Sequence, residues 1–192
     1  MFLTLKKLVV VNFVFLSELF GNSKIEFNPY DLDPNFKVTK VHTPVDHIKI
    51  FEVLCKSHKK INNKKPNDNR LSMAWAQISL ENGRGKKIWN NNLGNQGPHH
   101  VKQKYYLHLR NGWPYRSFDD LDESGISYWR IINRCSSALQ AFDAGDVNTA
   151  ALYLKKCNYY GSDAESYTKT LKNLYYEARY KILPEVSCEE GN

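Results

Sequence analysis

Apolar side chains recur at helical spacing along most of the chain and predict a mainly α fold. Helices are expected over residues 46–61, from about residue 69 onward, within 115–144 with Ser117 as the cap, over 146–157 with Asp146 as the cap, and in a final segment containing Tyr167 and Tyr175. Between residues 98 and 114 the period changes, because Val101, Gln103 and Tyr105 alternate as in a strand. We therefore expect helices accompanied by a small β or irregular lobe.

The second helix places a carboxylate in line with its own apolar stripe. Asp68 or Asn69 can cap the start of this helix, and Gly83 or Gly85 can end it. Four positions at spacings of three, four and three residues share one face: Leu71, Ala74, Ile78 and Glu81. A surface helix normally carries its charges on the other face.

This position of Glu81 predicts a carboxyl group with a raised pKa. Burial raises a carboxyl pKa, and the negative end of the helix dipole acts in the same direction. General acid catalysis needs a carboxylic acid that stays protonated near neutral pH. The following loop supplies Trp89 and the amides of Asn91 and Asn92, which suit a sugar with apolar faces and hydroxyl edges. Alternatively, Glu81 is a partly exposed helix-end residue and the asparagines only form turns.

The stretch AWAQISLENGRGKKIWNNNLGNQG resembles the signature of lysozyme-fold peptidoglycan hydrolases, above all the glucosaminidase family. Members have a helix reading A-x-A-Q-x-x-L-E-[ST]-G-x-G and, after a short spacer, N-N-x-[FL]-G. The matching residues are Ala76, Gln77, Leu80, Glu81, Gly83, Gly85, Asn91, Asn92, Leu93 and Gly94. The resemblance implies a lysozyme-like fold and makes Glu81 the catalytic acid.

The sequence also departs from the family pattern. Asn82 replaces the usual Ser or Thr, and Arg84 replaces a frequent Trp, which removes an aromatic wall and adds a positive charge. Many glucosaminidases supply a second carboxylate from the next lobe, but no Asp or Glu lies between Glu81 and Asp119. The second acid is therefore absent or comes from residues 119–123 or 163–165. Lytic transglycosylases work with one glutamate, so hydrolysis and transglycosylation both remain open, as does the bond that is cut.

The stretch CNYYGSDAESYTKTLKNLYYEARY resembles the family's late tyrosine–loop–helix motif. In that motif a tyrosine faces the catalytic glutamate. Tyr160 lies seven residues before Tyr167 and fits one version of the motif, whereas Tyr159 is the alternative register. The expected substrate-binding residues are Tyr160, Tyr159, Asn91, Asn92 and Trp89.

The chain is expected to have three parts: a signal peptide at 1–23, an extended arm at 24–46, and a lysozyme-like glycan hydrolase domain at 47–185. Lys6 and Lys7 precede an apolar core, and Gly21 and Ser23 suit cleavage near residues 22–24. An uncleaved anchor or an amphipathic helix is the alternative, although the apolar run is short for a membrane span. We therefore expect a secreted or periplasmic protein without stable membrane insertion.

Charge and composition narrow the partners. The 192 residues carry a formal net charge of +7, and 42% are hydrophobic, which suits one basic domain with a real core. A basic exported domain suits an anionic polymer, and without a nucleic-acid-binding motif we expect peptidoglycan glycan strands and not nucleic acid. His42 and His47 lack the spacing of a metal site, and His58 is expected at a helix surface or helix C-terminus. We expect no metal, no cofactor and a monomer.

Four cysteines in an exported chain indicate disulfide bonds. Cys55, Cys135, Cys157 and Cys188 allow three pairings. Cys135 and Cys157 sit at the outer ends of a predicted helical hairpin, so we expect them to pair and leave Cys55 with Cys188.

These features predict an exported glycosidase that cleaves the β-1,4 bonds of peptidoglycan with Glu81 as general acid. It would be an N-acetylglucosaminidase, a muramidase or a lytic transglycosylase. The alternative is a non-catalytic glycan-binding or inhibitor-like protein on a lysozyme scaffold. Intact Glu81 favours the enzyme, whereas the missing second acid and Arg84 favour the alternative.

Overall fold

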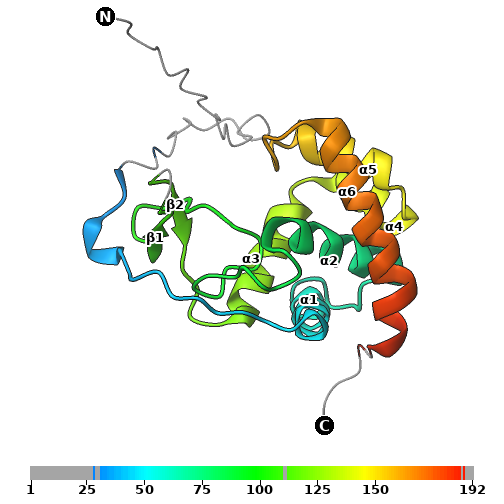
Figure 1. The fold of residues 1–192 in the computed structure, drawn as a ribbon, viewed down its shortest axis with the longest axis horizontal. Coiled ribbons are helices and arrows are strands. Elements are labelled where there is room, and N and C mark those ends of the chain that lie inside the picture. Colours follow the sequence, from blue (N-terminus) through cyan, green and yellow to red (C-terminus); the bar gives the residue numbers. More distant parts are fainter. Residues whose placement is uncertain (1–27, 29–30, 110–111, 187, 189–192) are drawn as a thin grey trace, which may run out of the picture.

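The computed structural model describes residue 28, residues 31–109, residues 112–186 and residue 188. It confirms a mainly helical class with a small antiparallel sheet (Figure 1). The α-helices are α1 (His47–Asn62), α2 (Asp68–Asn82), α3 (Leu121–Asn133), α4 (Ser136–Ala144), α5 (Val147–Lys156) and α6 (Ala164–Glu177). The strands are β1 (Tyr105–Leu107) and β2 (Pro114–Arg116), and short 3₁₀ or π turns occur at η2 (Pro34–Phe36), η3 (Ala178–Ile182) and η4 (Leu183–Glu185).

Helix α2 is the centre of the fold. It lies between the β lobe and the α4–α6 group in Figure 1, and it contacts α1, α4 and α6. Every side chain from Leu71 to Ser79 is buried, so this part of the helix is enclosed on all faces. The buried surface is therefore wider than the single apolar stripe that was predicted. Asn67 caps its start by accepting from the Arg70 N–H, whereas Asp68 and Asn69 were expected to do so. Gly83 ends it with φ +63°, as one of the two predicted glycines.

The other helix boundaries follow from local capping. Asp146 caps α5, as predicted, by accepting from the Thr149 N–H. Asp120, and not Ser117, caps α3 by accepting from the Glu123 N–H. The expected helical region within 115–144 is two helices, because the chain turns at Cys135 between α3 and α4.

The β lobe lies at the opposite end of the molecule from α4, α5 and α6 (Figure 1). Strands β1 and β2 are antiparallel, with Tyr106 opposite Tyr115, and the two rings stack with centroids 5.9 Å apart. Of the two forms expected for this lobe, β or irregular, the structure has the β form. The expected signal segment, residues 1–23, lies outside the described residues. Within the described part, no helix has the length and apolar character needed to cross a membrane.

The arm before α1 runs along the domain and ties the β lobe to the turn after α2. The Val38 N–H donates to the Tyr105 carbonyl at 2.8 Å, and the Val45 N–H donates to the Gly85 carbonyl at 3.0 Å. A Cβ at Gly85 would lie 2.0 Å from the Val45 carbonyl oxygen, and Gly85 also has φ +86°. Only glycine permits this approach of the arm to the turn.

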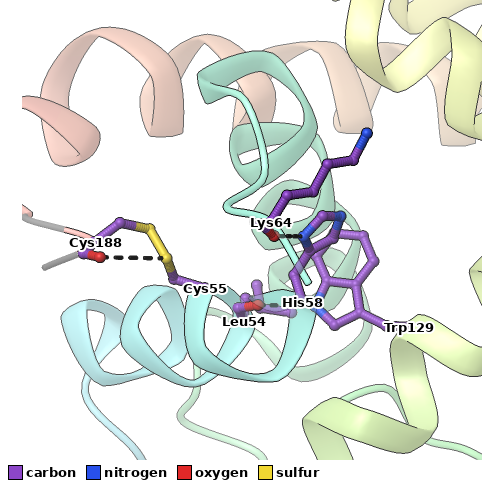
Figure 2. Close-up of a disulfide and its surroundings, with 6 residues drawn as sticks. All are labelled: Leu54, Cys55, His58, Lys64, Trp129 and Cys188. Carbon is purple, nitrogen blue, oxygen red and sulfur yellow. Dashed lines mark hydrogen bonds between the residues drawn. A yellow bond between two sulfur atoms is a disulfide. The ribbon is translucent and has the colours of Figure 1, made fainter. Parts of the chain in front are cut away.

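Both predicted disulfides are present. Cys55 in α1 pairs with Cys188 near the C-terminus, with their Cα atoms 5.9 Å apart (Figure 2). Cys135 before α4 pairs with Cys157 after α5, with their Cα atoms 6.2 Å apart. The first bond fastens the C-terminal segment to the first helix, and the second closes the α4–α5 hairpin.

His58 is fully buried, so the prediction of a surface position was wrong. It lies beside Trp129, and its Nδ1 hydrogen-bonds the Lys64 carbonyl at 2.8 Å (Figure 2). Arg70 donates to its Nε2 at 3.0 Å and also pairs with Asp143. Burial lowers the pKa of His58, so the ring is a neutral internal bridge and not a surface charge.

Candidate active site

Glu81 lies in the last turn of α2, where the enclosed helix reaches the edge of the core. Its side chain is half-buried, and burial raises the pKa of its carboxyl group above the ordinary value. A hydrogen bond with the Asn95 side chain acts in the opposite direction but does not cancel the effect. The Asn95 amide also donates to the Glu81 carbonyl at 2.8 Å and so fixes the loop against the helix end. Burial therefore gives Glu81 the raised pKa that the sequence pattern predicted.

Three tyrosines from separate elements lie within the electrostatic reach of Glu81. Tyr115 comes from β2, Tyr159 from the loop before α6, and Tyr167 from α6. Burial is the main cause of the raised pKa of each phenol, and the negative charge of Glu81 raises each pKa further. The charge of Glu81 therefore acts on phenols contributed by β2, by the loop before α6 and by α6.

Gln77 lies one helical turn before Glu81 and joins this polar group. The buried Tyr128 hydroxyl donates to Gln77 Oε1 at 2.6 Å. Gln77 Nε2 and the hydroxyls of Tyr159 and Tyr167 are buried, and none of them makes a well-formed hydrogen bond in the described part of the chain. Gln77 nevertheless lies close enough to Tyr167 for a side-chain interaction that acts to lower the pKa of that phenol. Buried polar atoms are normally paired, so the Tyr159 hydroxyl, which has no partner among the described residues, is the unusual member of this group. Sequence reasoning missed Gln77 as a site residue, although its spacing of four from Glu81 was available.

The structure separates the two tyrosine registers. The Tyr159 hydroxyl lies near Gly94, where an added Cβ would be 3.5 Å from its oxygen, and the charge of Glu81 raises the pKa of this phenol. The Tyr160 hydroxyl instead donates to the Ala151 carbonyl at 3.1 Å, and its ring stacks on Tyr167 with centroids 3.5 Å apart. Of the two candidates, Tyr159 is therefore the one that interacts electrostatically with Glu81, and Tyr160 packs on Tyr167.

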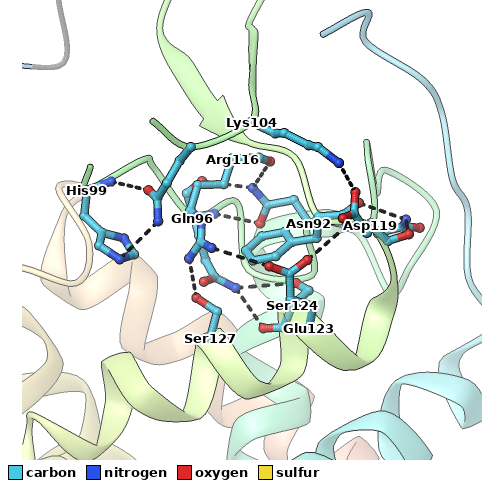
Figure 3. A network of polar contacts seen from close by, with 12 residues as sticks. Asn92, Gln96, His99, Lys104, Arg116, Asp119, Glu123, Ser124 and Ser127 are labelled. Atoms are coloured by element: carbon cyan, nitrogen blue, oxygen red, sulfur yellow. Dashed lines mark hydrogen bonds and ion pairs between the residues drawn. The ribbon is translucent and has the colours of Figure 1, made fainter. Parts of the chain in front are cut away.

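The asparagine loop is organised by its own side chains (Figure 3). The Asn92 amide donates to the Gln96 and Arg116 carbonyls at 2.9 and 3.0 Å, and its Oδ1 accepts from the Gln96 N–H at 2.8 Å. The Asn91 amide donates to the Phe118 and Asp119 carbonyls at 3.2 and 3.1 Å. Both amides thus have a structural role, and their predicted contact with sugar stays a prediction.

Asn82, the departure from the usual Ser or Thr, links the helix end to the same loop. Its side chain is fully buried, and its amide donates to the Leu93 carbonyl at 2.7 Å. Its Oδ1 accepts from the Gly85 N–H at 2.7 Å. Because an amide both donates and accepts, Asn82 holds the loop and the turn in place on either side of Glu81.

Two other predicted features have partners of their own. Trp89 is half-buried, with the His42 ring 4.7 Å from its ring and Lys40 Nζ 3.9 Å from its centroid. Arg84 makes a two-point ion pair with Glu177 of α6, at 2.8 and 2.6 Å. Trp89 is thus covered by the arm, and Arg84 connects the end of α2 to α6.

Most of the candidate second acids have structural partners, and Glu165 lies exposed in the first turn of α6. No other carboxylate contributes to the shifted pKa of Glu81 among the described residues. Asp120 and Asp163 cap helices α3 and α6. Ion pairs or backbone hydrogen bonds occupy the remaining acidic residues near α3, Asp119, Asp122 and Glu123. No cluster of three or more potential metal ligands occurs in the part of the chain that the structure describes.

Two hollows lie away from Glu81. One, of about 280 Å³, is lined by residues of α2, η4 and the C-terminal segment, including Leu71 and Cys188. The other, of about 520 Å³, lies between α5 and α6 beside Tyr160. Neither is lined by Glu81, so the site is defined by its polar group and not by these hollows. Comparisons of the chain with family models, curated proteins and solved structures found no match.

Proposed function

We propose that the protein is an exported glycosidase that cleaves the β-1,4 bonds of peptidoglycan glycan strands. The observation that supports this most is the half-buried Glu81, whose pKa is raised by burial and whose neighbours are tyrosine hydroxyls. A protonated carboxyl beside neutral donors suits the delivery of a proton to a glycosidic oxygen. The resemblance of residues 69–97 to the glucosaminidase signature supports the choice of substrate.

In the proposed mechanism, Glu81 protonates the oxygen of the leaving sugar as the glycosidic bond breaks. The sugar then passes through an oxocarbenium-like transition state. Tyr159 would position the substrate or the carboxyl group, because its buried hydroxyl has no partner among the described residues. Gln77 would hold Tyr128 and Tyr167 in place around it. The attacking group is water or a hydroxyl of the sugar itself, and a one-carboxylate site is compatible with the second.

The test is the substitution Glu81→Gln, which nearly keeps the shape of the side chain but removes the acidic proton. Positioned proton transfer contributes about 10²–10⁴-fold, so cleavage of purified wall should fall by at least about two orders of magnitude. Glu52→Gln is the matched control, because Glu52 is an exposed glutamate of α1 that pairs with Lys49 on the same helix. A Glu81→Gln protein that cleaves wall at near-parental rate would contradict the proposal.

Mass spectrometry of the digested wall defines the reaction. New reducing ends indicate attack by water, and anhydro ends indicate attack by the muramic 6-hydroxyl. The sugar found at the new end identifies the bond that is cut.

One observation favours a second candidate, a non-catalytic glycan-binding or inhibitor-like protein. Asp119, Asp120, Asp122 and Asp163 are engaged in caps or ion pairs, and no carboxylate of the described residues contributes to the pKa shift of Glu81. This candidate predicts binding to purified wall without new ends of either kind, with the parent and with Glu81→Gln alike. The same digest therefore separates the two candidates.

Export and a monomeric state belong to the same proposal. The Cys55–Cys188 and Cys135–Cys157 bonds suit an oxidising compartment, as a secreted or periplasmic protein would meet.

A further inference from the structure

The outward face of α6 and η3 exposes two aromatic side chains. Tyr176 and Tyr180 are 46% and 68% exposed, and they are the only large aromatic residues in the exposed class within the described part of the chain. Their rings stack on each other, with centroids 6.0 Å apart and planes inclined by 21°. The pair therefore forms a preorganised flat surface in solvent, where aromatic burial gains nothing for the isolated domain.

The same face continues toward the start of α6 with polar and basic side chains. Lys169, Asn173, Tyr176 and Tyr180 follow one another at spacings of four, three and four residues, and all are exposed. On a helix such spacing aligns side chains in one stripe. Because the buried face of α6 includes Tyr167, next to Glu81, the stripe faces away from the candidate acid.

At its N-terminal end the stripe reaches the hollow of about 520 Å³ between α5 and α6. Three lysines, Lys155, Lys169 and Lys172, line this hollow against a single carboxylate, Glu165. Tyr160 and Leu152, which is 52% exposed, give it apolar area. Lys155 Nζ lies 5.0 Å from the centre of the Tyr160 ring. The surface thus combines apolar area with ammonium groups along one side of the molecule.

We propose that this surface, defined by Lys169, Lys172, Tyr176 and Tyr180 with the adjoining hollow, is a second glycan-binding site. Its ligand is an anionic polysaccharide strand. The choice of peptidoglycan as that strand rests on the proposed function. The stacked tyrosines cover the apolar faces of sugar rings, and the lysines attract carboxylates carried by the strand. A helix face that merely kept the protein in solution would need the lysines but not the exposed tyrosine pair.

A second site on the far side of α6 has a specific use for an enzyme that acts on an insoluble polymer. It holds the protein on the wall while the Glu81 site releases one product and finds the next bond. Two linked contacts with one polymer act at a high effective concentration. The site would therefore govern retention on wall and not the bond-breaking step.

Binding is tested in the Glu81→Gln protein, so that retention on wall is measured without cleavage. Cosedimentation with purified, protease-treated peptidoglycan is compared for this protein and for the added pair Tyr176→Ala and Tyr180→Ala. We expect the pair to bind about tenfold more weakly, which corresponds to about 1.4 kcal/mol. The pair Tyr176→Phe and Tyr180→Phe keeps the stacked rings and should bind within about twofold of the parent.

Leu109→Ala is the matched control, because Leu109 is 85% exposed and lies in the β lobe away from α6. Lys169→Gln with Lys172→Gln should weaken binding at low salt and have less effect at high salt, since salt screens exposed charges. Unchanged binding of the alanine pair would overturn the proposal, and so would the absence of any binding of the Glu81→Gln protein to the protease-treated wall.

Failure of this site is distinguishable from failure of the proposed function. If Glu81→Gln does not reduce cleavage but the alanine pair loses retention, the binding site stands and the assignment of the acid is wrong. If Glu81→Gln abolishes cleavage and the alanine pair still sediments fully with wall, the acid stands and the second site is refuted.

Discussion

Substituting Phe for Tyr159 and for Tyr128 should change stability in opposite directions, although each removes one buried hydroxyl. The Tyr159 hydroxyl has no partner in the described part of the chain, so it bears the cost of lost hydration without compensation. An unpaired buried polar group costs about 1–3 kcal/mol, and Phe removes it with little change of shape. The free energy of unfolding of Tyr159→Phe should therefore stay level or rise by up to that amount.

The Tyr128 hydroxyl donates to Gln77 Oε1 at 2.6 Å in a fully buried position. Tyr128→Phe leaves that oxygen without its donor and should lower the free energy of unfolding by about 1–3 kcal/mol. For a domain of this size, about 1 kcal/mol corresponds to a change of about 2–4 °C in melting temperature.

Urea unfolding followed by circular dichroism measures both variants, because the midpoint shifts with stability when the slope is unchanged. Wall cleavage by Tyr159→Phe should fall while its stability does not, as is common for residues that serve function at the expense of stability. Equal destabilisation by the two substitutions would mean that the Tyr159 hydroxyl is paired in solution. The account of an unsatisfied site beside Glu81 would then be wrong.

Three further predictions follow from single contacts. Tyr160→Phe should retain wall cleavage and lose about 1 kcal/mol of stability, because its hydroxyl serves only the Ala151 carbonyl; strong loss of cleavage in an activity assay would restore Tyr160 as the site residue. The folded parent binds the Glu81 proton more tightly than the unfolded chain does, so the parent loses stability as pH rises above the ordinary carboxyl value of 4.5 toward the raised pKa of Glu81. Glu81→Gln should therefore gain stability relative to the parent over this range, as denaturation at a series of pH values would measure. A stability advantage of the variant that is confined to acid would contradict this prediction. Removing the Cys135–Cys157 bond, which spans 22 residues, should lower stability by about 3 kcal/mol, and removing the Cys55–Cys188 bond, which spans 133 residues, by about 5 kcal/mol. The reason is that a longer closed loop restricts the unfolded chain more, and thermal unfolding of the two Cys→Ser pairs measures the difference. A larger loss for the shorter loop would argue against this entropic explanation.

The elements that could be predicted from the sequence are those whose ends are determined by residues close by in the chain. Asp146 before an apolar helix is a single clear cap, and α5 begins there. At the start of α3, Ser117, Asp119 and Asp120 compete for the same role within four positions, and only the packing of the helix selects Asp120. The prediction was therefore right about the helix and wrong about its first residue.

Burial around α2 could not be predicted in full, because periodicity detects one apolar stripe and α2 has neighbours on every side. Gln77 looks like a polar-face residue by pattern, yet it is fully buried against Tyr128. The asparagine loop presents the same difficulty. Its amides bond to carbonyls of residues such as Arg116 and Phe118, which are distant in sequence and adjacent only after folding.

The choice between Tyr159 and Tyr160 was beyond the pattern for a related reason. Tyr159 and Tyr160 are the same type of residue, and their spacings to Tyr167 differ by only one position, so the sequence pattern fits either of them. Only the path of the chain between α5 and α6 brings one phenol under the influence of the Glu81 charge and pairs the other with the Ala151 carbonyl. The raised pKa of Glu81 was easier to predict, because the apolar helix positions that place this residue are also the ones that bury it.

The Cys55–Cys188 bond affects what happens when a protease cuts the chain. It joins the first helix to the C-terminal segment, so a single cut of the backbone anywhere between those cysteines leaves two pieces that stay covalently attached. A cut at the tip of the β lobe would separate α1 and α2, with Glu81, from α6, with Tyr167, yet Arg84 and Glu177 would still draw them together. Nicked molecules would run at full length on a non-reducing gel and fall apart only when reduced. A protein built in this way survives cleavage as a single particle, which suits work in surroundings where proteases are common.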